Sequence, residues 1–429
     1  MKNIQTLKSL PLKNIGFKFF NIGTFFLPSA TFIGILFLFS ASIIGSFIQK
    51  ENYLKSIYGK LFFLYGILIT LSSLVHKFVI NKNFENLISQ DAFLTGIGNW
   101  IPFLWIFWAL QPYLYSKENR KNFAILLISG SVPLIVGGFG QYFFNMHGPF
   151  EVFDGLIIWY QRSTNNGLTS IFNNQNYAGS WFNFLLPFCV ALFFVHTKNY
   201  LKKSISLLFL ISVGFSIILT NSRNAWGGIF FAIPMVVGYQ TFLWLIPTLF
   251  LISLILLICI SPLFSGDLQD LFRSLIPFKV WKEFSVLRAA KLEITRLGLI
   301  QNGLKLSFLS PFFGFGATAF AAILEYNTGI KRAHVHNLLI ETAISYGYPA
   351  AIVLFLTVSI ILIFSFKKIF ISTNNLNFFE RAWWASISFF LISQLFDAQY
   401  FEGKISIVFW ILLAGLKNIL DEDNESIEN

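Results

Sequence analysis

The chain has 429 residues, of which 55% are hydrophobic, 18% aromatic and only 12% charged, with a mean hydropathy of +0.66. A soluble globular protein carries about 25% charged residues, so this composition excludes an ordinary soluble enzyme and indicates a polytopic helical membrane protein. The net charge of +11 would suggest nucleic acid in a soluble protein. Here lysine and arginine flank the ends of predicted spans, and we expect no nucleic-acid partner.

The hydrophobic runs predict about twelve transmembrane helices, with both ends of the chain in the cytoplasm. Lysines before Phe17 and after Ile48 should both lie inside, which requires two short spans that turn near Pro28. The other spans are predicted at about 57–79, 93–115, 122–146, 177–196, 204–220, from the turn at 220–224 to 240, 242–263, 348–366, 383–398 and 404–419.

This pattern divides the chain into four regions. Residues 1–263 hold the first nine spans and an external loop at 147–175, and residues 264–335 form a long periplasmic segment with interfacial helices. Residues 336–420 hold the last three spans, and the acidic tail at 421–429 is expected to be disordered. The two cysteines, Cys189 and Cys259, lie in apolar runs, so neither a disulfide nor a metal site follows from them.

The long external segment carries more basic than acidic residues. The preference of lysine and arginine for the cytoplasmic side does not explain this excess, because the segment lies outside. Its stretch from Val286 to Leu297, which includes Arg288 and Arg296, mixes apolar and basic residues like a helix that lies on a membrane surface. Attraction to anionic headgroups is one explanation. A site for an anionic substrate presented by the outer leaflet is the other, and the pattern alone leaves both open.

A histidine stands where this polar segment ends and the hydrophobic pattern resumes. Nineteen uncharged residues from Tyr348 to Phe366 precede Lys367 and Lys368, as expected of a span that ends in the cytoplasm. His336 is then placed at the outer headgroup layer, where its imidazole is a candidate general base. The alternative is an interfacial polar residue that begins a helix. Glu341, five residues later, would point in a different direction from His336 on a helix, so the residue that orients the imidazole stays unidentified.

Four segments, in order along the chain, resemble a known family. The first is the Asn-containing segment 172–179, and the second is a Ser-Arg turn at 220–225. The third is Arg296 followed by the Pro-x-x-Gly-x-Gly within residues 310–316, and the last is His336-Asn337, separated by nine residues from Gly347. Together they resemble the O-antigen ligase and polymerase superfamily of bacterial inner-membrane glycosyltransferases, over about residues 162–350. The commonest family form has a tryptophan shortly after the arginine, where this chain has Ile300 and Gln301.

The resemblance implies an all-α, GT-C-like integral membrane enzyme of the bacterial inner membrane. Its reaction moves a glycan from undecaprenyl diphosphate to an acceptor hydroxyl at the periplasmic face, with inversion and without a metal or other cofactor. His336 would activate the acceptor, while Arg223 and Arg296 would hold the diphosphate through planar sets of N–H donors. Membrane lipids would surround the site.

The favoured reaction is the ligation of O-antigen to lipid A-core, and three alternatives stay open. Polymerisation of repeat units and transfer to a protein hydroxyl use the same donor chemistry with a different acceptor. A transporter of a small anion such as bicarbonate predicts ionisable residues inside the spans. Most predicted spans of this chain carry none, which favours the enzyme.

Further polar side chains of the external segments are candidates for substrate binding. They are Arg162, Asn174, Asn176, Arg288 and Asn337. For Asn174 and Asn176 the alternative is a helix cap before the span that begins near Tyr177. The external sequence contains no Asp-x-Asp or His-rich motif of the kind that holds a metal, so the arginines are expected to supply the positive charge.

Overall fold

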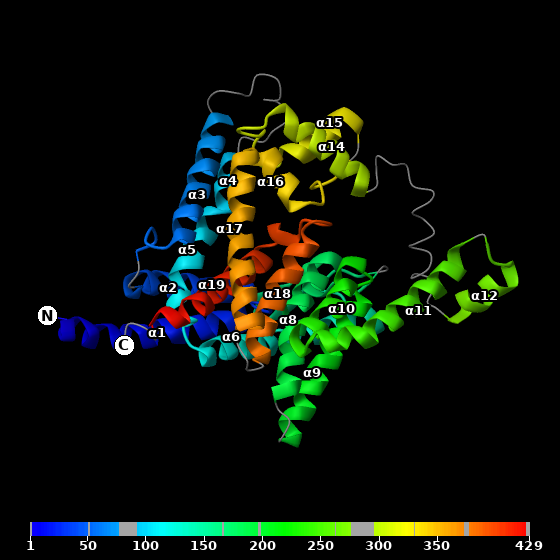
Figure 1. The fold of residues 1–429 in the computed structure, drawn as a ribbon, viewed down its shortest axis with the longest axis horizontal. Helices are drawn as coiled ribbons and strands as arrows, with labels where there is room; N and C mark the ends of the chain where they lie inside the picture. The colour runs from blue at the N-terminus through cyan, green and yellow to red at the C-terminus, as the bar shows by residue number, and fades with distance from the viewer. Residues whose placement is uncertain are drawn as a thin grey trace.

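The computed structural model describes residues 2–49, 52–76, 92–164, 167–195, 199–261, 263–275, 296–329, 331–372 and 377–425, which fold almost entirely into helices (Figure 1). The helices are α1 (Lys2–Phe26), α2 (Thr31–Ile48), α3 (Ile57–Val75), α4 (Ala92–Gly98), α5 (Ile101–Ala109), α6 (Lys117–Gly130), α7 (Val132–Phe144), α8 (Gln175–Val195), α9 (Tyr200–Leu219), α10 (Arg223–Val237), α11 (Phe242–Ile260), α12 (Gly266–Leu275), α14 (Arg296–Leu309), α15 (Ala319–Thr328), α16 (Leu338–Tyr346), α17 (Tyr348–Phe366), α18 (Phe378–Ser393) and α19 (Gly403–Glu425).

Eight helical segments of the described chain are long and apolar enough to cross a membrane. They are Thr31–Ile48, Ile57–Val75, Ala92–Ala109, Lys117–Phe144, Gln175–Val195, Tyr200–Leu219, Tyr348–Ser372 and Gly403–Glu422. The predicted class, an all-α membrane protein, is confirmed. The predicted spans beyond these eight fall on α1, which carries several lysines, on α10 and α18 with 15 and 16 residues, and on α11.

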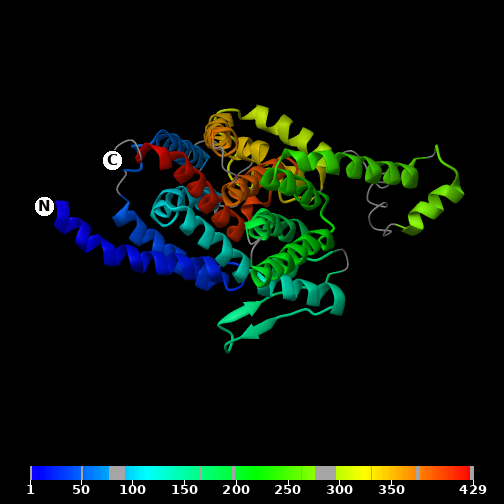
Figure 2. The same cartoon turned by 60° about the horizontal axis from the view of Figure 1, so that its bottom comes forward.

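The predicted turn near Pro28 is present, because α1 ends at Phe26 and α2 begins at Thr31. Gly34 of α2 allows the two helices to pack closely at this turn, because a Cβ at this position would lie only 2.4 Å from the Cα of Leu27. A small hairpin of β1 (Phe150–Val152) and β2 (Ile157–Trp159) pairs Glu151 with Ile158 and projects from the edge of the bundle (Figure 2). The Trp159 indole N–H donates to the Ser29 carbonyl at 2.6 Å, which ties the hairpin to the α1–α2 turn.

The last helix, α19, occupies the centre of the bundle, with α5, α17 and α18 packed against it (Figure 1). Its residues from Lys404 to Ile419 are buried, and Trp410 is fully enclosed. Trp383 of α18 donates its indole N–H to the Leu412 carbonyl at 2.6 Å. Because lipid offers no alternative partners, such buried donors must be satisfied inside the bundle, and this fixes α18 against α19.

The acidic tail was expected to be disordered, and this expectation is wrong for residues 421–425, which continue α19. Asp421 forms a 2.5 Å ion pair with Lys417, one turn earlier, and Glu422 lies 2.6 Å from Arg120 of α6. Both cations are only 3% exposed. Buried cations need anionic partners, so the acids that would be solvated in an isolated tail are held on the bundle.

Replacing Arg120 with methionine should therefore lower the free energy of unfolding. Arg120 lies 3.2 Å from Glu380 and donates to the carbonyls of Leu114 and Tyr115. Its removal takes this cation away from the carboxylate of Glu380, which is buried. Loss of one partner of a buried pair costs about 3–5 kcal/mol. Thermal unfolding in detergent measures the change. Lys331→Met, which removes an exposed pair with Glu325, is the control and should change stability by less than about 0.5 kcal/mol. Equal effects of the two variants would contradict this account.

Candidate functional site

Two side chains, an imidazole and a guanidinium, meet on one carboxylate at the end of the bundle where α14 and α16 begin. His336 Nδ1 lies 2.7 Å from Asp397 Oδ1, and a terminal nitrogen of Arg296 lies 3.4 Å from Asp397 Oδ2. The Asp397 residue is 4% exposed, while the side chains of His336 and Arg296 are 23% and 41% exposed. The carboxylate is thus buried behind an imidazole and a guanidinium that both reach the surface.

The turn between α18 and α19 fixes the position of Asp397. The Ala398 N–H donates to Asp397 Oδ1 at 2.9 Å, and the Asp397 N–H donates to the Ser393 carbonyl at 3.1 Å. Burial alone would raise the pKa of Asp397, but the hydrogen bond and charge of His336 and the charge of Arg296 hold it below the usual value. The group is therefore an anion at neutral pH.

The backbone around His336 is held from two directions. His336 has a left-handed conformation with φ of +58°, which is uncommon for a residue other than glycine. The following Leu338 N–H donates to the Gln394 carbonyl at 2.9 Å, and the preceding Val335 N–H donates to Glu341 Oε2 at 2.9 Å. Glu341 is 4% exposed. Glu341 thus supports the histidine through the backbone rather than by contact with the ring.

The two glycines of the Pro-x-x-Gly-x-Gly segment let two backbones approach each other. Phe315 and Gly316 donate their N–H groups to the carbonyls of Ile344 and Ser345 at 2.7 and 3.0 Å. A Cβ at Gly314, which has φ of +69°, would lie 2.4 Å from the Ile344 oxygen. The motif therefore anchors the segment after α14 on the end of α16, the helix that follows His336.

Arg223, the third predicted site residue, is exposed at the first position of α10. Its two neighbours hold this turn in place: Ser222 donates its hydroxyl to Asn176 Oδ1 at 2.8 Å, and Asn224 donates to the Ser393 carbonyl at 3.3 Å. Ser393 also accepts the Asp397 N–H. The structure thus joins Arg296 and His336 through Asp397 and places Arg223 on a turn attached to the same end of α18.

The remaining candidates have structural contacts. Asn174 Oδ1 accepts the N–H of Asn176 at 2.8 Å, and Asn337 Oδ1 accepts that of Ile340 at 3.0 Å, so both cap helices, as the alternative for Asn174 foresaw. Arg162 is exposed, and its carbonyl accepts from Gln141 at 2.6 Å. Arg288 lies outside the described residues, as does most of the predicted surface helix at 286–297.

Sequence reasoning missed Asp397, the partner that orients His336. Asp397 and Glu402 are the two acids at the short connection between the last two predicted spans. A search of this connection for a carboxylate would have produced these two candidates. Only the fold distinguishes them, since it places Asp397 against His336 and Glu402 beside Lys404.

The family comparison covers three of these site residues. Residues 206–355 match the model of a family described as O-antigen ligase, and this segment includes Arg223, Arg296 and His336. This match supports the resemblance of the chain to the O-antigen ligase and polymerase superfamily. The match supports a ligase-type or polymerase-type enzyme that acts on lipid-linked glycans, and it ends before Asp397. No curated protein sequence matches the chain.

The Glu341 carboxyl should make the stability of this protein pH-dependent. Burial raises its pKa from 4.5 to about 7, although the Val335 N–H opposes the shift. A raised carboxyl pKa contributes stability that is present below about pH 4.5 and is lost as pH rises to about 7.

Between pH 4 and pH 8 the wild type should therefore lose about 3 kcal/mol relative to Glu341→Gln, which stays neutral and keeps an acceptor for Val335. Thermal unfolding of both proteins across this range tests the expectation. Parallel pH profiles would contradict it.

Proposed function

We propose that this protein is an O-antigen ligase-type glycosyltransferase that moves a glycan from undecaprenyl diphosphate to a hydroxyl of lipid A-core. The observation that carries the proposal is the shared carboxylate of Asp397, which contacts both the candidate base and a candidate diphosphate-binding arginine. Base and leaving-group stabiliser are the two functions that such a transfer requires.

His336 is suited to act as the base because Asp397 selects its tautomer. When Nδ1–H donates to Asp397, the other ring nitrogen, Nε2, is left to accept the proton of the acceptor hydroxyl. The acceptor oxygen then bonds to the anomeric carbon as the bond from that carbon to the diphosphate oxygen breaks. Attack from the face opposite the leaving group inverts the configuration. The Asp397 anion stabilises the imidazolium that forms.

The two arginines are suited to the departing lipid diphosphate. A guanidinium has five N–H donors, and Arg296 lies against Asp397 through one terminal nitrogen while its side chain is 41% exposed. Arg223 begins α10 and is exposed, so its charge adds to the positive end of the helix dipole. In this proposal the reaction needs fixed positive charge and no metal.

The proposed location is the periplasmic face of the bacterial inner membrane, with both termini in the cytoplasm. His336 comes shortly before α17 and Asp397 shortly before α19, and both helices belong to segments long and apolar enough to span a membrane. The cluster therefore lies near the ends of spans, where the diphosphate of a lipid carrier would be found. In the proposed division, residues 264–335 form the long periplasmic segment.

The acceptor distinguishes ligation from polymerisation, and lipopolysaccharide from a strain without the gene reveals it on a gel. Loss of all polymer from the core is the result expected of a ligase. A core that carries a single repeat unit would instead identify a polymerase, and an unchanged ladder would count against both.

The site residues are tested by the rate of transfer in purified protein, with EDTA present throughout. His336→Ala and Asp397→Asn should each lower the rate by about 10²–10⁴-fold, since one removes the base and the other its orienting anion. His147→Ala, at a histidine of the 147–175 loop whose Nδ1 lies 2.9 Å from the Asn145 carbonyl, is the matched control and should keep the wild-type rate. Full activity of His336→Ala, or a strict need for added Mg²⁺, would refute the proposed mechanism.

A further inference from the structure

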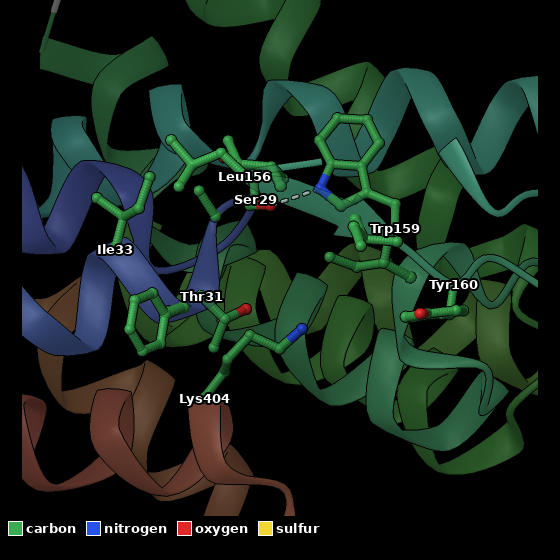
Figure 3. A pocket seen from close by; sticks show the side chains of 12 residues that line it. Ser29, Thr31, Ile33, Leu156, Trp159, Tyr160 and Lys404 are labelled. Atoms are coloured by element: carbon green, nitrogen blue, oxygen red, sulfur yellow. Dashed lines mark hydrogen bonds between the residues drawn. The ribbon is translucent and has the colours of Figure 1, made fainter. Parts of the chain in front are cut away.

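A lysine ammonium is buried beside a pocket close to the candidate site (Figure 3). The pocket has a volume of about 240 Å³ and lies between the α1–α2 turn, the β hairpin and the start of α19. Ser29, Thr31, Trp159 and Lys404 are among the residues that line it. Figure 3 shows the Lys404 side chain directed toward the space between Thr31 and Trp159.

Lys404 is unusual for a lysine at the end of a membrane span. As the second residue of α19 it would normally extend its ammonium into water, yet the residue is only 6% exposed. Lysine is almost never buried to this extent without a partner. A buried ammonium is therefore expected to have an anion near Nζ.

The protein itself provides only part of that compensation. The nearest described carboxylate oxygen, Glu402 Oε1, is 3.8 Å from Lys404 Nζ, which is longer than a direct hydrogen bond. Burial raises the pKa of Glu402, although the charge of Lys404 opposes the shift. The Phe172 ring, with its centroid 4.1 Å from Nζ, adds a cation–π contact. Ammonium donors are thus left for a ligand in the pocket.

The surroundings of the pocket are those of a lipid boundary. Phe32, Leu156 and Ile158 line it and are 73%, 63% and 41% exposed. Thr31 and Lys404 lie at the first turns of α2 and α19, two candidate spans, so the pocket is at their shared end. Trp159 is of the type that membrane proteins favour at the headgroup layer.

We propose that this pocket binds the phosphate headgroup of an anionic membrane lipid, with the phosphate on Lys404 and the apolar chains along Phe32 and Leu156. Its volume is below the ~300–1,000 Å³ of pockets that enclose whole ligands, which suits a headgroup. The exposed apolar rim favours a lipid over a free phosphate. Asp397 lies in the connection between α18 and α19, and Lys404 is the second residue of α19, so a short stretch of chain links the pocket to the candidate site. This inference does not rest on the proposed function.

Native mass spectrometry of the delipidated full-length protein tests the site, with phosphatidylglycerol and phosphatidylcholine as probes. The wild type should retain phosphatidylglycerol in preference to phosphatidylcholine. Lys404→Met should weaken that binding about tenfold or more, because a desolvated charge is lost from the site. Thr31→Val removes only a pocket hydroxyl and should weaken it about two- to fivefold, which keeps the test decisive if Lys404→Met does not fold.

Lys331→Met is the matched control, since this exposed lysine is 3.0 Å from Glu325 and far more solvated. It should change phosphatidylglycerol binding by less than about twofold. Millimolar inorganic phosphate should not displace the lipid. Unchanged phosphatidylglycerol binding in the Lys404 and Thr31 variants would overturn the proposal, and displacement by inorganic phosphate would show that the pocket takes a free anion instead.

Discussion

The arrangement of the candidate site depends on a single buried carboxylate, that of Asp397. An anion that is 4% exposed is unfavourable unless charges and donors surround it. Here an imidazole, a guanidinium and the Ala398 N–H do so. The imidazole and the guanidinium stabilise the carboxylate, and the carboxylate in turn holds both groups in position. This explains how two partly exposed side chains from distant segments keep a fixed position relative to each other.

The scaffold brings those segments together through backbone contacts near the ends of helices. The carbonyls at the end of α18 receive donors from Leu338, Asn337 and Asn224. The end of α16 receives donors from Phe315 and Gly316. The segments that contain Arg223, Arg296 and His336 are therefore attached to neighbouring helix ends. Substitutions at Gly314 would disturb the site without any contact with a substrate, since the backbones could no longer approach.

The sequence predicted the features that depend on local pattern. Long apolar runs located the helices, Pro28 marked a turn, and the switch from polar to apolar residues placed His336 before α17. It could not supply the pairing of His336 with Asp397, because 61 residues separate them and neither position has a local pattern that points to the other. The prediction of a disordered tail was wrong for the same reason. Its acids appeared solvated until the fold placed Arg120, 302 residues away, against Glu422.

Lys404 shows the opposite case, in which a charge is buried without full compensation from the protein. Lys404 is the second residue of α19, and Asp397 lies in the short connection that precedes this helix.

The central claim, that Asp397 selects the tautomer of His336, is tested most directly by ¹⁵N NMR of histidine-labelled protein. The His336 signals are assigned by their loss in His336→Gln. The account predicts a ring protonated at Nδ1 and unprotonated at Nε2 in the wild type, and loss of that preference in Asp397→Asn. A ring protonated at Nε2 alone, or a tautomer unchanged by Asp397→Asn, would contradict it.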